Sequence, residues 1–274
     1  TADATNNTLI LSAAITGEKG QEAASAGITE DGGAGGLGLD INATVDVASN
    51  IVNLELVDNA DITGGAGGAK SAASGSGGDG NAAIDATEFD VINIQLSATD
   101  TTADVVTFAG GLGGAKSGGS GADSDVGIIV ATGGKIVITE EISGTATATT
   151  ISSIDLNTIT GANVEVDASA ITGAVTINAV SGNTVITTGG GADDISTGTG
   201  ADTISLGAGN DTVDSQTGKD TITLGAGRDV VDINAVATDG SMASDSDATN
   251  FTTITDFALS ASAITTVNLS NAAN

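Results

Sequence analysis

Aspartates spaced nine residues apart are the strongest chemical signal in the sequence. Written in nines from Thr188, the chain gives five consecutive segments with Gly in the fourth place, Asp in the sixth and a β-branched aliphatic residue in the eighth. The sixth-place residues are Asp193, Asp202, Asp211, Asp220 and Asp229. Carboxylate and carbonyl oxygens are the ligands that Ca²⁺ prefers. The spacing therefore indicates a regular series of sites for a hard divalent cation.

The residues around each Asp indicate how the carboxylates are positioned. Repeated Gly allows tight turns that leave backbone carbonyls open towards a ligand. The eighth-place aliphatic residue, between small polar residues, predicts a very short strand with one buried side chain. Two such units would close a flattened coil with turns stacked on each edge. Acidic turns on a metal-free solenoid are the alternative, but stacked, unpaired carboxylates would repel one another, and this favours a bound cation.

The array resembles the RTX family, whose nonapeptide is GGxGxDx-(aliphatic)-x and whose repeats form a right-handed parallel β-roll. The resemblance implies calcium ions between turns stacked on the same edge, held by aspartates and backbone carbonyls. It implies three sites. The first would use Gly189, Gly191, Asp193, Leu206, Ala208 and Asp211; the second Gly198, Gly200, Asp202, Ser215, Thr217 and Asp220; the third Gly207, Gly209, Asp211, Leu224, Ala226 and Asp229. Gln216 breaks the second-place Gly column and the first place is never Gly, so we expect modest distortion.

The nine-residue phase continues on both sides of the array. Upstream, Gly173 and Gly182 keep the fourth place without an Asp in the sixth, which predicts metal-free coils from 151 to 187. Downstream, Asp247 could form a weaker fourth site with the carbonyls of Met242 and Ser244, or it could lie in a solvated acidic loop.

The end of the chain has its own pattern. The run 251–257, FTTITDF, leads to VNLS at 267–270, and this looks like the segment that follows RTX arrays in type I-secreted proteins. Phe251 and Phe257 suit an aromatic cap over the open end of the roll, so 233–274 is interpreted as a C-terminal cap.

Residues 1–150 are predicted to be a β-rich region with three Gly-rich repeats. Ile15, Ile62 and Phe108 recur at intervals of 47 and 46 residues, and each opens a Gly/Ala/Ser/Lys segment. Alternating apolar residues between these segments predict strands. The predicted strands are Leu9–Ile15, Leu37–Val47, Ile51–Val57, Val91–Leu96, Val105–Phe108, Gly127–Ala131 and Lys135–Ile142. The Gly-rich segments fit long surface loops, or packed glycine layers that make lattice contacts.

Composition excludes several classes of function. Lys and Arg number 6 against 35 Asp and Glu, a net charge of −29, so the chain lacks the basic surface that nucleic acid and anionic membranes require. No apolar stretch approaches the roughly 20 residues of a membrane-spanning helix. The chain has no His, which excludes an HExxH zinc protease and a Ser-His-Asp triad, and no GxSxG elbow occurs. Acid/base chemistry by paired carboxylates stays open, but nothing in the sequence marks a cleft for it, so we expect no catalytic residues.

The whole profile resembles RTX-type bacterial surface-layer proteins: rich in Thr, Ala, Gly and Asn, free of Cys, and calcium-binding at its C-terminal end. The resemblance implies a secreted structural protein in which calcium drives folding after type I secretion and then lattice assembly. The expected partner is a second copy of the chain, and cell-surface polysaccharide through regions outside this sequence. An RTX adhesin module and the non-catalytic C-terminal part of a secreted RTX enzyme are the alternatives.

Overall fold

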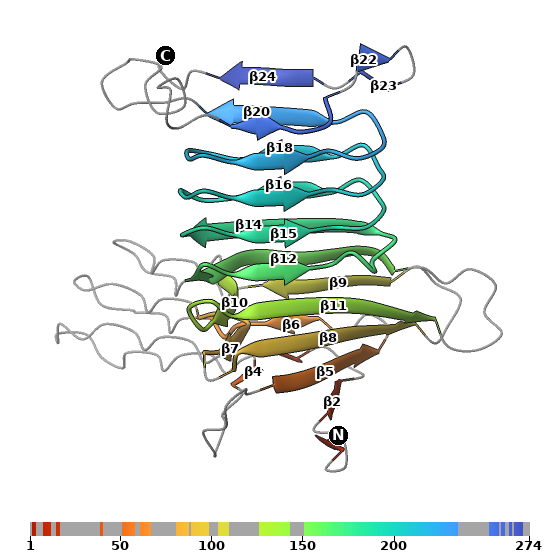
Figure 1. Ribbon diagram of the computed structural model, residues 1–274. Helices are drawn as coiled ribbons and strands as arrows, with labels where there is room; N and C mark the ends of the chain where they lie inside the picture. Colours follow the sequence, from red (N-terminus) through yellow and green to blue (C-terminus); the bar gives the residue numbers. More distant parts are fainter. Residues whose placement is uncertain are drawn as a thin grey trace, which may run out of the picture.

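A computed structural model describes the chain over 2–3, 8–11, 15–16, 39–40, 51–57, 61–66, 81–87, 89–98, 104–109, 126–142, 151–234, 252–257, 259–260, 263–264 and 266–270. These residues form strands joined by turns, stacked as the rungs of one column that runs from β2 to β24 (Figure 1). No helix long and apolar enough to cross a membrane occurs in these ranges.

Two long sheets make up the column. Sheet I contains β1 (Ala2–Asp3), β2 (Thr8–Leu11), β5 (Ile51–Val57), β8 (Val91–Ala98), β11 (Lys135–Ile142), β13 (Glu165–Asp167), β15 (Val185–Thr187), β17 (Thr203–Ser205), β19 (Thr221–Thr223) and β21 (Thr253–Ile254), in that order. Sheet II runs from β24 (Thr266–Ser270) through β20 (Val230–Asn234), β18 (Thr212–Asp214), β16 (Asp194–Ser196), β14 (Ala174–Ser181), β12 (Ile151–Ala162), β10 (Val126–Val130) and β7 (Ile84–Ala86) to β4 (Leu39–Asp40). Three further strands, β3 (Ile15–Thr16), β6 (Ile62–Thr63) and β9 (Asp104–Ala109), join sheet II beside β12, and β22 (Leu259–Ser260) pairs with β23 (Ala263–Ile264) alone.

Strand pairing within both long sheets is parallel, apart from β1 with β2. The coils shorten along the chain: Val91 pairs with Lys135, Glu165 with Val185, and Val185 with Thr203. In the array the repeat is 18 residues, which is two nonapeptides. The parallel β-solenoid predicted for this part of the chain is therefore confirmed.

The core is a pair of aliphatic ladders between the sheets. The eighth-place residues alternate between sheet II and sheet I, and each is at most 1% exposed: Ile195, Ile204, Val213, Ile222 and Val231. Burying one such side chain stabilises the fold by about 1.5–3 kcal/mol. In the array every coil adds equivalent aliphatic side chains, so the core there is thin, whereas the buried aromatic residues Phe89 and Phe108 lie in the N-terminal part of the core.

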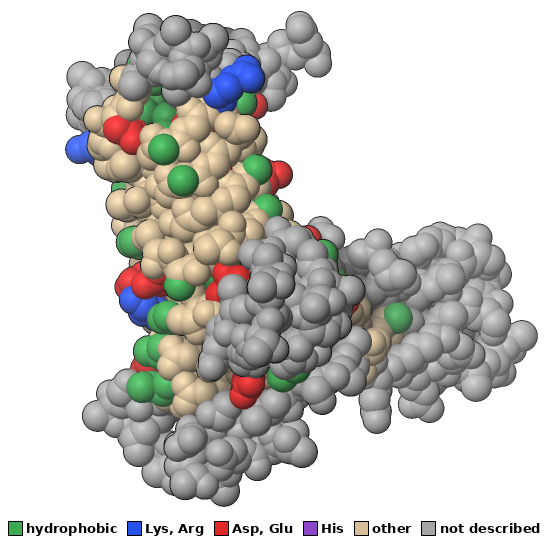
Figure 2. Space-filling model, turned by 90° about the vertical axis from the view of Figure 1, so that its right-hand side faces the viewer, with side chains coloured by type: hydrophobic (Ala, Val, Ile, Leu, Met, Phe, Trp, Pro, Cys, Tyr) green, Lys and Arg blue, Asp and Glu red, His purple; other side chains and the backbone are tan. Residues whose placement is uncertain are grey.

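The face of the described column that is shown in Figure 2 is mostly uncharged. In the view of Figure 2, polar side chains and backbone cover most of the described column, and hydrophobic side chains are scattered singly. Among the described residues the large exposed hydrophobics are Ile51, Val105, Val185 and Phe257, at 44–47% exposure.

The N-terminal prediction holds for strands and for repeat register. Ile51–Val57 and Lys135–Ile142 have the predicted bounds, whereas only Leu39–Asp40 of the predicted Leu37–Val47 is described. Ile15 pairs with Ile62, and Ile62 with Phe108, so the sequence repeat is a stack of parallel rungs. The Gly-rich segments lie mainly outside the described residues. Neither sheet is interrupted at the boundary expected near residue 150, because β11 pairs with β13 and β10 with β12.

Candidate calcium sites

The Gly/Asp turns of the array stack in register on both edges of the solenoid. The first edge carries turns 188–193, 206–211 and 224–229, and the second edge carries turns 197–202 and 215–220. Backbone bridges join Gly190 to Ala208 and Ala208 to Ala226 on the first edge. Thr199 bridges Thr217 on the second edge. The pairing of each repeat with the next but one is therefore confirmed.

Glycine in the fourth place is required by this close stacking. A Cβ atom on Gly209 would overlap the carbonyl oxygen of Gly191, and one on Gly227 would overlap that of Gly209. On the second edge, a Cβ atom on Gly218 would overlap the carbonyl oxygen of Gly200. The fourth-place carbonyls thus point into the space between stacked turns, where the family pattern expects ligands.

The five sixth-place aspartates are all buried, at 0–2% exposure. Each carboxylate accepts a hydrogen bond from the backbone amide 18 residues earlier. The amide of Asp193 donates to Oδ1 of Asp211 at 2.9 Å, and the amide of Asp202 donates to Oδ1 of Asp220 at 3.0 Å. The amide of Asp211 donates to Oδ1 of Asp229 at 3.2 Å. Each pair of sixth-place residues predicted to share an ion is therefore in direct contact.

Three of the five aspartates have a second carboxylate oxygen without a partner. Oδ2 of Asp193, Asp202 and Asp211 is fully buried and accepts no hydrogen bond. A buried anionic oxygen without a partner is strongly unfavourable. A calcium ion between the turns would supply the missing positive charge, so these residues fit the predicted metal.

The charges perturb one another in the absence of metal. The pKa of the Asp211 carboxyl is raised from 3.8 to about 6, chiefly by burial and also by the carboxylates of Asp193 and Asp229, while the hydrogen bond from the Asp193 amide opposes the rise. Burial also raises the pKa of Asp193 and of Asp220. Asp211 is the most affected because it lies between two neighbouring carboxylates on the first edge.

Backbone carbonyls must supply most of the ligands. No group of three or more His, Cys, Asp or Glu side chains with metal-binding spacing occurs among the described residues. Several predicted carbonyl ligands also accept amide hydrogen bonds between turns, as Gly189 does from Ala208 at 2.8 Å and Thr217 from Gly200 at 3.1 Å. A carbonyl oxygen has two lone pairs, so such a bond leaves one for a metal.

Comparison with known protein families identifies the array of Gly/Asp turns. A family model described as RTX calcium-binding nonapeptide repeat (4 copies) matches residues 178–213 and 207–232. The chain carries an RTX calcium-binding array. RTX nonapeptide repeats bind calcium, and proteins that carry them are typically exported by type I systems, which supports an extracellular location. Neither the curated proteins nor the solved structures contain a match to the chain.

The RTX match begins ten residues before Thr188, in a coil without sixth-place Asp. This coil is still hydrogen-bonded to the stacked aspartates, because the Thr184 amide and hydroxyl both donate to Oδ1 of Asp202 at 2.8 Å. The amide of Val175 likewise donates to Oδ1 of Asp193 at 2.9 Å. The coils before the array therefore donate the hydrogen bonds that hold the first aspartate carboxylate on each edge.

Gln216 departs from the RTX consensus in a way that the structure explains in part. Its φ of 54° lies in the left-handed region that favours glycine. Its amide nitrogens donate to the Asp214 carboxylate, the backbone one at 3.2 Å and the side-chain one at 3.0 Å. The distortion expected at Gln216 is therefore a left-handed backbone conformation. Two hydrogen bonds to the Asp214 carboxylate hold the residue in it.

Within the described residues, polar contacts join the last turns of the RTX array to the segment 252–257. Asp256 accepts hydrogen bonds from the amides of Leu224 at 2.8 Å and Gly225 at 2.7 Å, and the Thr252 hydroxyl donates to Oδ2 of Asp220 at 3.2 Å. Phe257, predicted to cap the open end of the roll, is 44% exposed, so its ring is not buried there. Phe251 and the proposed Met242, Ser244 and Asp247 site lie outside the described residues.

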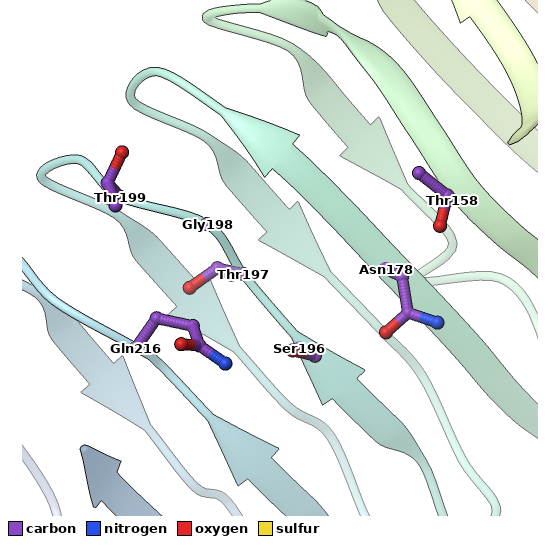
Figure 3. Close-up of a pocket in the computed structure, with 7 residues that line it drawn as sticks. All are labelled: Thr158, Asn178, Ser196, Thr197, Gly198, Thr199 and Gln216. Carbon is purple, nitrogen blue, oxygen red and sulfur yellow. The ribbon is translucent and has the colours of Figure 1, made fainter. Parts of the chain in front are cut away.

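A shallow groove adjoins the second edge of the RTX array. It is lined by Thr158, Asn178, Ser196, Thr197, Gly198, Thr199 and Gln216 (Figure 3). Three of these residues form one column across sheet II, with Thr158 beside Asn178 and Asn178 beside Ser196. The other four belong to turns that the second calcium site would join. The groove therefore presents uncharged hydrogen-bonding groups in a strongly acidic chain.

Proposed function

We propose that this protein is a structural component of a bacterial surface layer, in which calcium folds the secreted chain and then promotes assembly of copies into a lattice. The observation that carries the proposal is the unbroken column of parallel coils from β2 to β24 with stacked RTX turns at its C-terminal end. Such a solenoid is an extended, rigid building block whose stability adds up coil by coil.

The charge of the chain supports a calcium-dependent assembly. With 35 acidic against 6 basic side chains, two copies repel each other at long range. Divalent cations reduce this repulsion, both inside the turns and at the surface. The absence of His and Cys from the sequence supports a structural role rather than a catalytic one.

The same charge suits export. In a calcium-poor cytosol the buried aspartates oppose folding, so the chain would stay unfolded for passage through a type I secretion channel. Outside the cell, calcium binds the folded state and stabilises it by mass action.

Electron microscopy of purified protein tests the lattice. Planar arrays should form when millimolar calcium is added and disappear on chelation. Asp202→Asn should impair array formation, whereas Asp194→Asn, which removes an exposed carboxylate, should not. Calcium-folded protein that remains monomeric at high concentration would refute the surface-layer role while leaving calcium binding intact.

An adhesin-like role is the second candidate, and the groove beside the second edge favours it. Its uncharged hydroxyl and amide groups suit a neutral polar ligand such as a glycan. Calcium-dependent binding to immobilised glycans, lost in Asn178→Ala, would favour this role. A third reading, the C-terminal part of a secreted enzyme, requires a catalytic domain elsewhere in the full protein.

A further inference from the structure

Two buried hydroxyls in the RTX array have no partner. Thr188 is 3% exposed and Ser215 is fully buried, and neither Oγ1 of Thr188 nor Oγ of Ser215 makes a hydrogen bond. Among the described residues, the other buried side-chain atoms without a partner are the three aspartate Oδ2 atoms of the calcium sites. Buried polar groups are almost always satisfied. These two hydroxyls therefore share the feature that marks the carboxylates as metal ligands.

Both hydroxyls belong to turns that hold a sixth-place aspartate: Thr188 begins the turn of Asp193, and Ser215 begins the turn of Asp220. Neither hydroxyl reaches hydrogen-bond geometry with an acceptor. Each of the first two sites thus has a buried hydroxyl and a buried carboxylate oxygen without a partner, Oδ2 of Asp193 in the first and Oδ2 of Asp202 in the second.

The residue in the first place of the nonapeptide differs between turns, so the three sites do not have the same number of hydroxyls available. Thr197 also has a hydroxyl there, but it donates to the Ser215 carbonyl at 3.2 Å. Leu206 and Leu224 instead bury apolar side chains, at 4% and 2% exposure. The third site, between these two turns, therefore has no hydroxyl available.

We propose that the Thr188 hydroxyl is a ligand of the first calcium site, with Asp193 and Asp211, and that the Ser215 hydroxyl is a ligand of the second, with Asp202 and Asp220. Each would add a seventh oxygen to the six of the family pattern, within the range of about 6–8 that calcium accepts. The third site keeps six and binds calcium most weakly. This inference depends on calcium binding by the array and not on the surface-layer role.

Thr188→Val tests the first assignment, because it keeps the shape of the side chain and removes the hydroxyl. Calcium titration against a competing chelator dye should show about a tenfold loss of affinity at one site. Ser215→Ala should produce the same loss at a different site, and the double variant should show both losses. Thr187→Val, the same change at the neighbouring half-buried position, is the control and should leave the three affinities unchanged.

A second measurement separates ligation from packing. Because Thr188→Val removes an unsatisfied group, the calcium-free protein should fold at least as well as wild type, by circular dichroism. Thr188→Ser should restore wild-type calcium affinity. The proposal is overturned if Thr188→Val binds calcium like the control, or if Thr188→Ser, which keeps the hydroxyl, shows the same loss as Thr188→Val.

Discussion

Asp211 offers the sharpest test of the predicted calcium sites, because its carboxylate would be shared by the first and third of them. Replacing it with Asn keeps an oxygen that can accept the Asp193 amide and removes the charge. Without calcium, that charge lies buried between Asp193 and Asp229 and opposes folding. With calcium bound as predicted, this charge would become a ligand of two ions. Asp211→Asn should therefore favour folding in calcium-free buffer and oppose it in calcium.

The size of the calcium-free effect follows from the pKa. Raising the pKa of Asp211 from 3.8 to about 6 corresponds to about 3 kcal/mol at 1.36 kcal/mol per pKa unit. Solvent screening at the edge of the solenoid reduces this to about 1–2 kcal/mol. The fold is relieved of this penalty below the unfolded pKa of 3.8, and the penalty develops as the pH rises through 6.

Far-UV circular dichroism is the suitable assay, since the chain has no Trp or Tyr. Metal-stripped wild type should gain β signal, or resistance to urea, when the pH is lowered from 7 to 5. Asp211→Asn should show a smaller pH response and a stronger β signal at pH 7. In calcium at pH 7, Asp211→Asn should need at least about tenfold more calcium for half-maximal folding.

Asp194→Asn is the matched control, because Asp194 carries the same charge at an exposed strand position. It should change neither the calcium requirement nor the pH response. If Asp211→Asn weakened the calcium-free fold, or if the two variants behaved alike in calcium, the assignment of Asp211 as a buried shared ligand would be refuted.

Three other substitutions probe the stacking, the core and the cap, each measured by urea unfolding in saturating calcium. Gly209→Ala should abolish the native stack, because its Cβ would overlap a backbone carbonyl, whereas Gly133→Ala, which meets open space at φ 74°, should cost only about 1–2 kcal/mol; equal effects would contradict the close approach. Ile204→Ala should lower the free energy of unfolding by about 2–5 kcal/mol and Ile204→Val by about 0.5–1.5 kcal/mol, and a smaller loss for alanine would mean that the ladder is loosely packed. Asp256→Ala leaves two amides of the last turn without an acceptor and should cost about 1–3 kcal/mol; no change would show that the segment 252–257 does not close the array.

Much of the array was predictable from sequence because its determinants are local and periodic. Nine residues contain one turn and one strand, so the columns of Gly, Asp and aliphatic residues predict the pairing of Asp193 with Asp211 and the burial of Ile204. The alternation in residues 51–57 predicts that strand for the same reason. The recurrence of Ile15, Ile62 and Phe108 even anticipates parallel pairing between coils 46 or 47 residues apart.

Only the tertiary structure decided which polar groups lack partners. Whether Oδ2 of Asp211 or the hydroxyl of Thr188 is satisfied depends on neighbouring coils, and no spacing within one repeat reveals it. Asp256 accepts a hydrogen bond from Leu224, 32 residues earlier, through a contact that no periodicity in the sequence encodes. The sequence alone thus determined where the calcium-binding turns are and how they stack. The contacts between coils determined which oxygens in those turns are left for the ion.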